Sequence, residues 1–257
     1  MIGVFDSGVG GLGVLRHVRS QLPTADLVYV ADHAAAPYGT RSLAEVEERA
    51  ELCASWLAAQ GCRVVTIACN TASAAALHAL RRRMPDVDFV GMEPAVKPAA
   101  EVTGTGRVGV VATAATFQGE LFASVVARFA SGVEVLPAAC PTWVELVEEG
   151  RTRGPEVASE VRRCLKPLLD AGIDTLVLAC THYPALLEAI EAVVGPNVRI
   201  IDPAPAVASQ TARLARRRGV DTGRGRTELV STSDRDRLLA AAERMGIVAP
   251  ARVLALG

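Results

Sequence analysis

The sequence lacks an excess of charge of either sign. Its 257 residues contain 27 Lys and Arg against 28 Asp and Glu, which leaves a formal net charge of −1. Proteins that bind nucleic acid through bulk charge neutralise many phosphates and need a basic surplus to do so. We therefore expect no nucleic acid partner, and we expect any bound anion to be held by local backbone N–H groups and hydroxyls.

Long apolar runs are also missing. No stretch approaches the ~18 uninterrupted apolar residues that a membrane-spanning helix needs, so we expect no membrane partner. The N-terminal segment Met1–Asp6 has no basic region of the kind that opens a secretory leader. We therefore expect a cytoplasmic protein, and in that compartment cysteines stay reduced as free thiols. The cysteines are Cys53, Cys62, Cys69, Cys140, Cys164 and Cys180.

Aromatic residues and metal-binding patterns are scarce. Aromatics make up 4% of the chain, whereas half of the residues are apolar, so the core must consist mainly of Ala, Val and Leu. There is no CxxC pair and no closely spaced pair of histidines, which argues against a structural zinc site, and we expect no metal. The phosphate-binding pattern GxxxxGK[ST] is absent as well.

Short apolar runs rich in Val and Ile alternate with longer helical patterns along the whole chain. A typical helix pattern is Leu43–Gln60, which is followed by Gly61 as a stop signal. Continuous apolar runs indicate strands buried on both faces of a parallel sheet, so the alternation predicts an α/β fold with mostly parallel sheets. The expected strands are Ile2–Phe5, Leu27–Ala31, Val64–Ala68, Phe89–Met92, Val108–Ala112, Thr175–Ala179, Val198–Ile201 and Glu228–Ser231.

The chain contains an internal repeat. A shift of 111 residues lays Gly61–Val96 on Gly172–Val207 without a gap and matches Cys69 with Cys180. A shift of 106 residues lays Ile2–Ser7 on Val108–Thr113. We therefore predict two pseudo-symmetric α/β lobes, with the active site in the cleft between them.

Two of the cysteines occupy equivalent places in this repeat. Cys69 and Cys180 each follow a buried strand, and we expect each to begin a helix, where ligands bind in α/β folds and where a thiol's pKa falls. Two thiols on opposite sides of a small molecule suit stereoinversion at carbon, because one removes a proton from one face while the other returns a proton to the opposite face. Asp6 and His182 are suitably placed to assist them. Cys53, Cys62, Cys140 and Cys164 are expected to be structural.

The glycines near the N-terminus allow another interpretation. Gly8–Gly13 satisfies GxGxxG after a strand, and Asp32 follows at the spacing of a dinucleotide fingerprint, which would indicate an NAD-dependent oxidoreductase. Asp6 and Ser7 stand between the strand and the glycines, however, and a carboxylate there would repel a pyrophosphate. We favour a tight loop that offers N–H groups to a smaller anion, such as a substrate carboxylate.

Taken together, several segments resemble a known family. In order along the chain they are Asp6–Leu12, Pro37–Ser42, Cys69–Ser73, Glu93–Ala95, Ala112–Thr116, Cys140–Pro141 with Leu146–Glu148, and Cys180–Pro184. They are similar to glutamate racemases, in the cofactor-independent aspartate/glutamate racemase superfamily. The resemblance implies racemisation of glutamate without a cofactor, supplying D-glutamate for peptidoglycan synthesis. A sister activity on aspartate or another small acidic amino acid is the alternative.

The resemblance also implies roles for individual residues. Cys69 and Cys180 would be the paired acid/base thiols, with Asp6 assisting Cys69 and His182 assisting Cys180. Glu148 would be a further polar helper. The substrate's carboxylates and ammonium group would be held by Asp6, Ser7, Tyr38, Gly39, Asn70, Thr71, Thr113, Thr116, Thr181 and His182.

The family's architecture would divide this chain into one lobe of residues 1–93 plus 207–257 and a second of residues 94–206, and we expect a homodimer. The chain departs from the family's pattern in two places. His33–Ala36 replaces a stretch that usually carries a polar or basic residue, and Glu145 stands where a Pro is common. These departures bear on side-chain preference and dimer contacts rather than on the chemistry. We expect His33 itself to be a solvated loop residue.

Overall fold

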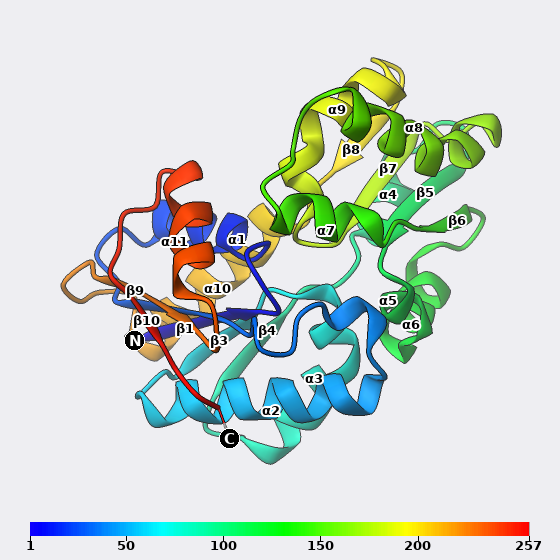
Figure 1. The fold of residues 1–257 in the computed structure, drawn as a ribbon. Coiled ribbons are helices and arrows are strands. Elements are labelled where there is room, and N and C mark those ends of the chain that lie inside the picture. Colours follow the sequence, from blue (N-terminus) through cyan, green and yellow to red (C-terminus); the bar gives the residue numbers. More distant parts are fainter. Residues whose placement is uncertain (257) are drawn as a thin grey trace. The chain divides into compact units, whose positions relative to one another are not determined.

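The chain folds into two compact units in the computed structural model, which describes residues 1–256. Unit 1 consists of Met1–Met92 together with the residues from Ala204 onward, and unit 2 is Glu93–Pro203. Each unit is a parallel sheet covered by helices (Figure 1). The predicted α/β class with parallel sheets is confirmed.

Unit 1 contains a six-stranded sheet in the order β10-β9-β2-β1-β3-β4, and every neighbouring pair is parallel. β1 lies inside this sheet, and all five of its residues are buried, as its apolar run predicts. The strands are β1 (Ile2–Asp6), β2 (Leu27–Ala31), β3 (Val64–Ile67), β4 (Asp88–Gly91), β9 (Thr227–Ser231) and β10 (Ala251–Val253).

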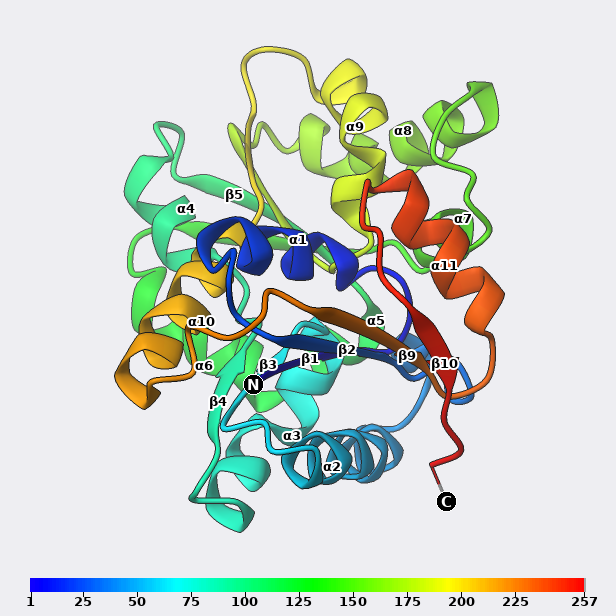
Figure 2. The same cartoon turned by 90° about the vertical axis from the view of Figure 1, so that its left-hand side faces the viewer.

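Helices cover both faces of this sheet (Figure 2). α1 packs against α10 on one face, and α2 packs against α3 on the other. The helices are α1 (Leu12–Gln21), α2 (Leu43–Ala59), α3 (Asn70–Arg83), α10 (Ala204–Arg218) and α11 (Arg235–Arg244), with a short 3₁₀ turn, η1 (Tyr38–Thr40).

Local signals fix the ends of α2. Ser42 accepts a hydrogen bond from the backbone N–H of Glu45, and the Glu45 carboxylate accepts one from the backbone N–H of Ser42, which is a capping box. At the other end Gly61 adopts a φ of +85°, a conformation that side-chain-bearing residues rarely adopt. The expected helix Leu43–Gln60 is therefore confirmed to within one residue.

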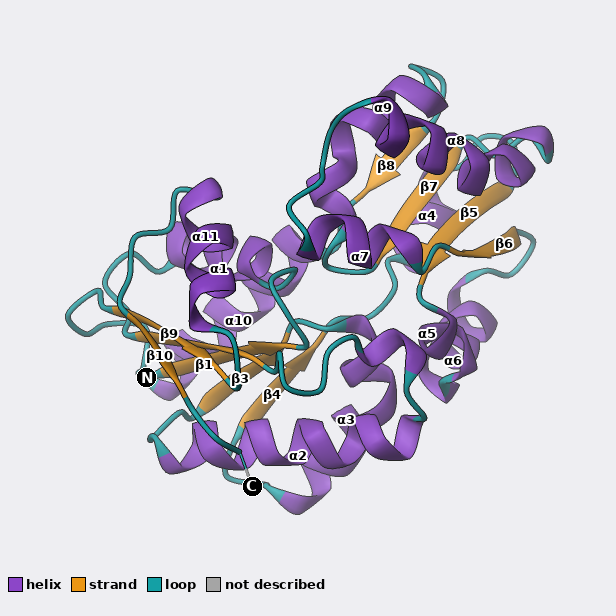
Figure 3. Cartoon of the chain, in the orientation of Figure 1, coloured by secondary structure: helices purple, strands orange, loops and turns teal. Residues whose placement is uncertain are grey.

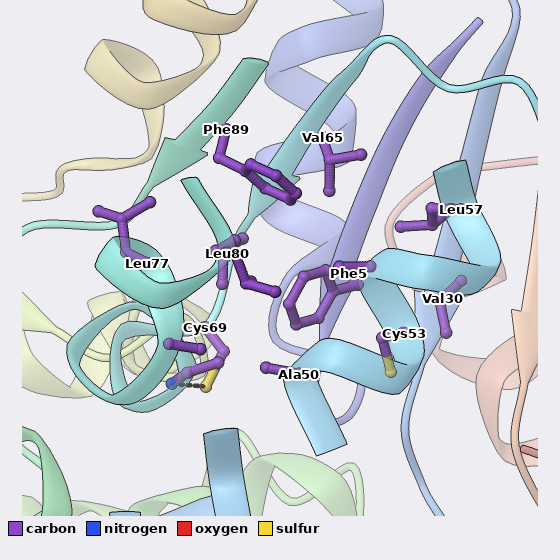
Figure 4. Packing of buried hydrophobic residues seen from close by; sticks show 14 of the residues in the cluster. Phe5, Val30, Ala50, Cys53, Leu57, Val65, Cys69, Leu77, Leu80 and Phe89 are labelled. Carbon is purple, nitrogen blue, oxygen red and sulfur yellow. Dashed lines mark hydrogen bonds between the residues drawn. The ribbon is translucent and has the colours of Figure 1, made fainter. Parts of the chain in front are cut away.

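The core of unit 1 lies between the sheet and the pair α2 and α3 (Figure 4). Phe5 and Phe89 from the sheet meet Leu57 of α2 and Leu80 of α3, and these four side chains are buried. Cys69 sits at the edge of the same cluster, at the start of α3. Close packing here places the end of β3 in a fixed position.

Unit 2 contains a four-stranded parallel sheet in the order β6-β5-β7-β8. α4 packs against α6. α8 packs against α9 (Figure 3). The strands are β5 (Arg107–Ala112), β6 (Glu134–Ala139), β7 (Thr175–Ala179) and β8 (Arg199–Ile201). The helices are α4 (Val96–Val102), α5 (Ala114–Gln118), α6 (Glu120–Phe129), α7 (Thr142–Glu148), α8 (Pro155–Asp170), α9 (Leu187–Val194) and the 3₁₀ turn η2 (Tyr183–Leu186).

The internal repeat is visible as a shared strand order. The run β2-β1-β3-β4 of unit 1 has the same order as β6-β5-β7-β8 of unit 2. β3 corresponds to β7 and β1 to β5, as the two sequence shifts predict. Unit 1 adds β9 and β10, which come from the C-terminal part of the chain.

Three expectations need correction. β6 and β10 were not expected as strands, because both are sheet-edge strands with partly exposed residues, and β6 contains Pro137. Cys180 does not begin an α-helix: η2 follows it, and α9 starts only at Leu187.

The third correction concerns the cysteines. Cys140 and Cys164 form a disulfide, with their Cα atoms 6.2 Å apart, so the expectation of six free thiols is wrong for these two. α8 packs against β6, which brings Cys164 close to the residue that follows that strand. Cys53, Cys62, Cys69 and Cys180 are free and buried.

Residues 1–256 contain neither a candidate membrane span nor a candidate metal site. None of the helices described there is both long and apolar enough to cross a membrane. The same residues contain no cluster of three His, Cys, Asp or Glu side chains arranged to hold a metal ion.

Candidate active site

The residues expected to carry function gather at the carboxyl edge of each sheet. In unit 1 they follow β1, β2 and β3, and in unit 2 they follow β5, β6 and β7. Carboxyl ends of neighbouring parallel strands meet at one edge, where α/β folds bind ligands. The unit 1 group is Asp6, Ser7, Tyr38, Gly39, Cys69, Asn70 and Thr71, and the unit 2 group is Thr113, Thr116, Glu148, Cys180, Thr181 and His182.

Cys69 is held at the N-terminus of α3. Its sulfur accepts a hydrogen bond from the backbone N–H of Ala72 at 3.4 Å, so the thiol itself caps the helix (Figure 4). Ser73, one turn into the helix, donates to the carbonyl of Ile67 and fixes the junction between β3 and α3. The Cys69 sulfur therefore lies at the positive end of the α3 dipole, among buried residues.

Asp6 and the glycine loop lie at the end of the neighbouring strand. β1 and β3 pair in register up to Phe5 and Ile67, so Asp6 follows next to Ala68. The Asp6 carboxylate is fully buried and accepts a hydrogen bond from the backbone N–H of Gly8 at 2.9 Å. Tyr29 Oη donates to the carbonyl of Gly8 at 2.6 Å. Both the N–H and the carbonyl of Gly8 are therefore hydrogen-bonded, which fixes the position of the loop.

Asn70 has a buried side-chain amide at the carboxyl edge of the unit 1 sheet. Its side chain is 3% exposed, yet neither its amide nitrogen nor its amide oxygen has a hydrogen-bond partner among the residues that the structure describes. A buried amide without partners costs about 1–3 kcal/mol, so such a group is normally satisfied by a ligand or water. Asn70 directly follows Cys69 in the chain and is the first residue of α3.

Cys180 of unit 2 belongs to a hydrogen-bonded chain of three side chains. Its sulfur lies 3.8 Å from His182 Nδ1, and His182 Nε2 lies 2.6 Å from Glu148 Oε1. All three side chains are buried. Burial alone would lower the pKa of His182, but its hydrogen bonds to Cys180 and Glu148, and the charges of both groups, raise the pKa well above its usual range. His182 is thus the side chain that links the Cys180 sulfur to the Glu148 carboxylate.

α7 carries Glu148 and is docked onto the loop after Cys180. Tyr183 Oη donates to the carbonyl of Cys140 at 2.8 Å, and the Tyr183 ring packs edge-on against Trp143 with 4.8 Å between ring centroids. These contacts hold Glu148 beside His182. Glu148, expected as a further polar helper, hydrogen-bonds to His182.

A hydroxyl pair completes the unit 2 edge. Thr113 caps the N-terminus of α5, and its hydroxyl lies 2.9 Å from that of Thr116. Both side chains are buried at the end of β5. Two hydroxyls together at a strand end suit recognition of a polar group such as a carboxylate.

The structure shows a hydrogen-bond network around Asp32 that the sequence did not reveal. Its buried carboxylate accepts hydrogen bonds from Arg49, Tyr38 and Thr232. Burial alone would raise the pKa of Asp32, but these hydrogen bonds outweigh burial and hold it below its ordinary value. Arg49 and Thr232 were not expected at the site, because they are 17 and 200 residues away from Asp32 in the chain. An Asp ending a buried strand was the only available signal.

This network disfavours the dinucleotide interpretation. The fingerprint would use Asp32 to bind a ribose hydroxyl, but here the carboxylate already accepts hydrogen bonds from three protein side chains.

The expectation that His33 is solvated is also wrong. Its side chain is buried, and Nδ1 lies 2.9 Å from Ser231 Oγ at the end of β9. Glu145 is exposed on α7.

The sequence matches a known protein family over most of its length. The model of the Asp/Glu/Hydantoin racemase family matches residues 12–211 of this chain. The chain belongs to the Asp/Glu/Hydantoin racemase family. Among relatives of this racemase, glutamate racemase of Roseiflexus sp. (strain RS-1) is 50% identical over 240 residues, which covers 92% of this chain and 88% of the relative.

Solved structures of glutamate racemases are similar to this racemase. Glutamate racemase isoform RacE1 from Bacillus anthracis has a TM-score of 0.89 and 31% identity, covering 99% of this chain and 97% of that one. Escherichia coli glutamate racemase, solved in complex with L-glutamate and the activator UDP-MurNAc-ala, has a TM-score of 0.86 and 31% identity, covering 100% and 98%.

Proposed function

We propose that this racemase interconverts L- and D-glutamate, with Cys69 and Cys180 as the two acid/base groups. The observation that carries the proposal is their equivalent position: each follows the corresponding strand, β3 or β7, of units that share one strand order. The identity to glutamate racemases supports glutamate as the substrate.

The chemistry needs one thiolate and one thiol. In one direction a thiolate takes the α-proton, the C–H electron pair remains on carbon as a carbanion, and the other thiol protonates the opposite face. One proton is taken and one is returned, so the step ends with the first sulfur as the thiol and the second as the thiolate. In the reverse direction the roles are swapped. An ordinary thiol pKa of ~8.5 requires only modest stabilisation of the thiolate near neutral pH.

Each sulfur has its own supporting groups. The α3 N-terminus serves Cys69, with Asp6 nearby as its helper, and the His182–Glu148 pair serves Cys180. We assign binding of the substrate's carboxylates and ammonium group to Ser7, Asn70, Thr71, Thr113, Thr116 and Thr181, together with the turn at Tyr38 and Gly39. We further propose that the protein acts in the cytoplasm as a homodimer and supplies D-glutamate for peptidoglycan.

Isotope exchange tests the proposal. The protein is incubated with L-glutamate or D-glutamate in D₂O without added cofactor, and optical rotation and α-deuteration are followed. We expect both to change for wild type, and racemisation to fall by about 10²–10⁴-fold in Cys69→Ser and in Cys180→Ser. Each variant should block α-proton exchange of one enantiomer far more than of the other, with opposite preferences.

Cys62→Ala is the matched control, because burial raises the pKa of Cys62 to about 12 and leaves it an inert thiol. No deuteration by wild type would overturn the activity, and equal loss of both exchanges in each variant would overturn the two-thiol assignment. Faster turnover of aspartate than of glutamate would overturn the substrate.

A further inference from the structure

The loop between β2 and α2 contains the Tyr38–Thr40 turn, which the proposed function places in the substrate site. We propose that Arg49 is a positioning residue that fixes this turn through the buried carboxylate of Asp32. The inference rests on the proposed function only for the role of the turn, because the contacts themselves lie within unit 1.

Arg49 forms a bidentate ion pair with Asp32 through two nitrogens of its guanidinium group. Nε donates to Oδ2 at 2.9 Å and Nη2 donates to Oδ1 at 2.7 Å. This bidentate geometry is among the strongest that a carboxylate can accept, and it fixes orientation as well as position. Asp32 has no exposed surface, and the Arg49 side chain is 21% exposed. The carboxylate is therefore shielded from water and depends on its protein partners for its charge.

Two other side chains donate hydrogen bonds to the Asp32 carboxylate: Tyr38, which lies in the loop, and Thr232, which is hydrogen-bonded to the loop. Tyr38 Oη donates to Oδ2 at 2.6 Å, and Thr232 Oγ1 donates to Oδ1 at 2.8 Å. The Thr232 hydroxyl in turn accepts a hydrogen bond from the backbone N–H of Ala34 at 2.9 Å. One carboxylate thus connects the start of the loop, its turn and helix α2.

The network changes what Tyr38 can offer a substrate. Its hydroxyl donates to Asp32 and the residue is 1% exposed, so Tyr38 acts by holding the turn in place rather than by offering its own hydroxyl to the substrate. The order of the turn then depends on how firmly Asp32 is held. Arg49 supplies the only guanidinium group among the described partners of that carboxylate.

The prediction is a split between kinetic constants. A turn that holds the substrate equally in the ground state and the transition state affects binding uniformly, so loosening it raises KM and leaves kcat nearly unchanged. We expect Arg49→Met to raise KM for glutamate about tenfold, in line with the loss of one charge-assisted hydrogen-bonding pair. Arg49→Lys keeps the cation without the fork and should be intermediate.

The matched control is Arg83→Met. Arg83 also forms ion pairs with α2, through Glu47 and Glu51, but it lies outside the network around Asp32. It should leave both constants at their wild-type values. Tyr38→Phe combined with Arg49→Met should raise KM by less than the product of the single effects, because both residues act through one carboxylate.

Hydrogen exchange gives a readout that does not depend on activity. Amides in the peptide spanning residues 35–42 should exchange faster in Arg49→Met than in wild type and Arg83→Met, while the core strand β1 stays protected. Faster exchange with a raised KM supports the proposal. Unchanged exchange in this peptide overturns it, as does a loss confined to kcat.

If Arg49→Met does not fold, the same comparison is made with Arg49→Lys. A wild-type protein that does not racemise glutamate would refute the proposed function, while the exchange measurement would still decide the role of Arg49.

Discussion

At the scale of single residues, the loop after β1 depends on the absence of a side chain at Gly11. A Cβ placed there would lie 2.7 Å from Asp6 Cβ and 2.9 Å from Tyr29 Oη, both closer than real Cβ contacts. We expect Gly11→Ala to lower the free energy of unfolding by about 1–3 kcal/mol, since overpacking a tight site forces its neighbours to move. Racemisation should fall as well, because Asp6 would be displaced.

Gly13, two residues later, has room for a side chain, in contrast to Gly11. Among the described residues, a Cβ there would have Met245 Cε as its nearest neighbour at 3.8 Å, and Gly13 is the second residue of α1. Gly13→Ala should therefore raise the free energy of unfolding by about 0.5–1 kcal/mol. Urea denaturation of the two variants and wild type checks both signs, and a destabilised Gly13→Ala or an unaffected Gly11→Ala would contradict this account.

At the scale of elements, Asp174 connects the start of β7 to the loop after α4. Its carboxylate accepts hydrogen bonds from Thr103 Oγ1 and Thr175 Oγ1 and from the backbone N–H groups of Gly104 and Thr105. Burial would raise the pKa of Asp174, but these four hydrogen bonds outweigh burial and lower it to about 2.

The sign of the resulting pH dependence follows from that shift. The folded-state pKa lies below the ordinary value of 3.8, so the contribution of Asp174 to stability is fully present above about pH 4. It is lost as the pH falls towards 2. We expect wild type to lose more free energy of unfolding between pH 4 and pH 2 than Asp174→Asn does.

Urea denaturation at a series of pH values measures this difference. Asp170→Asn is the control for removing one negative charge, since the Asp170 side chain is 61% exposed and pairs only with Lys166 in the described residues. Parallel curves for wild type and Asp174→Asn would refute the assignment.

The elements also show which local signals were sufficient. Strands buried on both faces, such as β1 and β7, could be predicted from their apolar runs alone. β6 could not, because an edge strand exposes residues and carries no continuous apolar run. The turn after Cys180 was mistaken for a helix start, since a 3₁₀ turn with Pro184 and the first turn of an α-helix look alike in sequence.

At the scale of the whole molecule, unit 1 is completed by the chain that returns after unit 2. α10 packs against α1 and β3, where the hydroxyls of Thr211 and Thr66 meet at 2.8 Å in the core. β9 pairs with β2 along its full length. Unit 1 therefore depends on residues separated from its first strands by more than a hundred positions.

Truncation tests this dependence. A chain ending at Pro203 lacks α10 and β9 and should show no cooperative unfolding transition for unit 1 by circular dichroism. A chain ending at Ile247 loses only the edge strand β10 and should keep a cooperative transition at a lower Tm. A fully cooperative unit 1 in the shorter chain would contradict the prediction.

The sequence by itself determined the α/β class, the internal repeat and the two strand-end cysteines. Those features depend on apolar runs and on Gly, Pro and Cys spacing, all of which act over a few residues. Only the tertiary structure decided that Arg49 pairs with Asp32, that His182 meets Glu148 and that Cys140 joins Cys164. Such partners lie far apart in the chain, and their meeting depends on strand order and helix rotation, which no local pattern encodes.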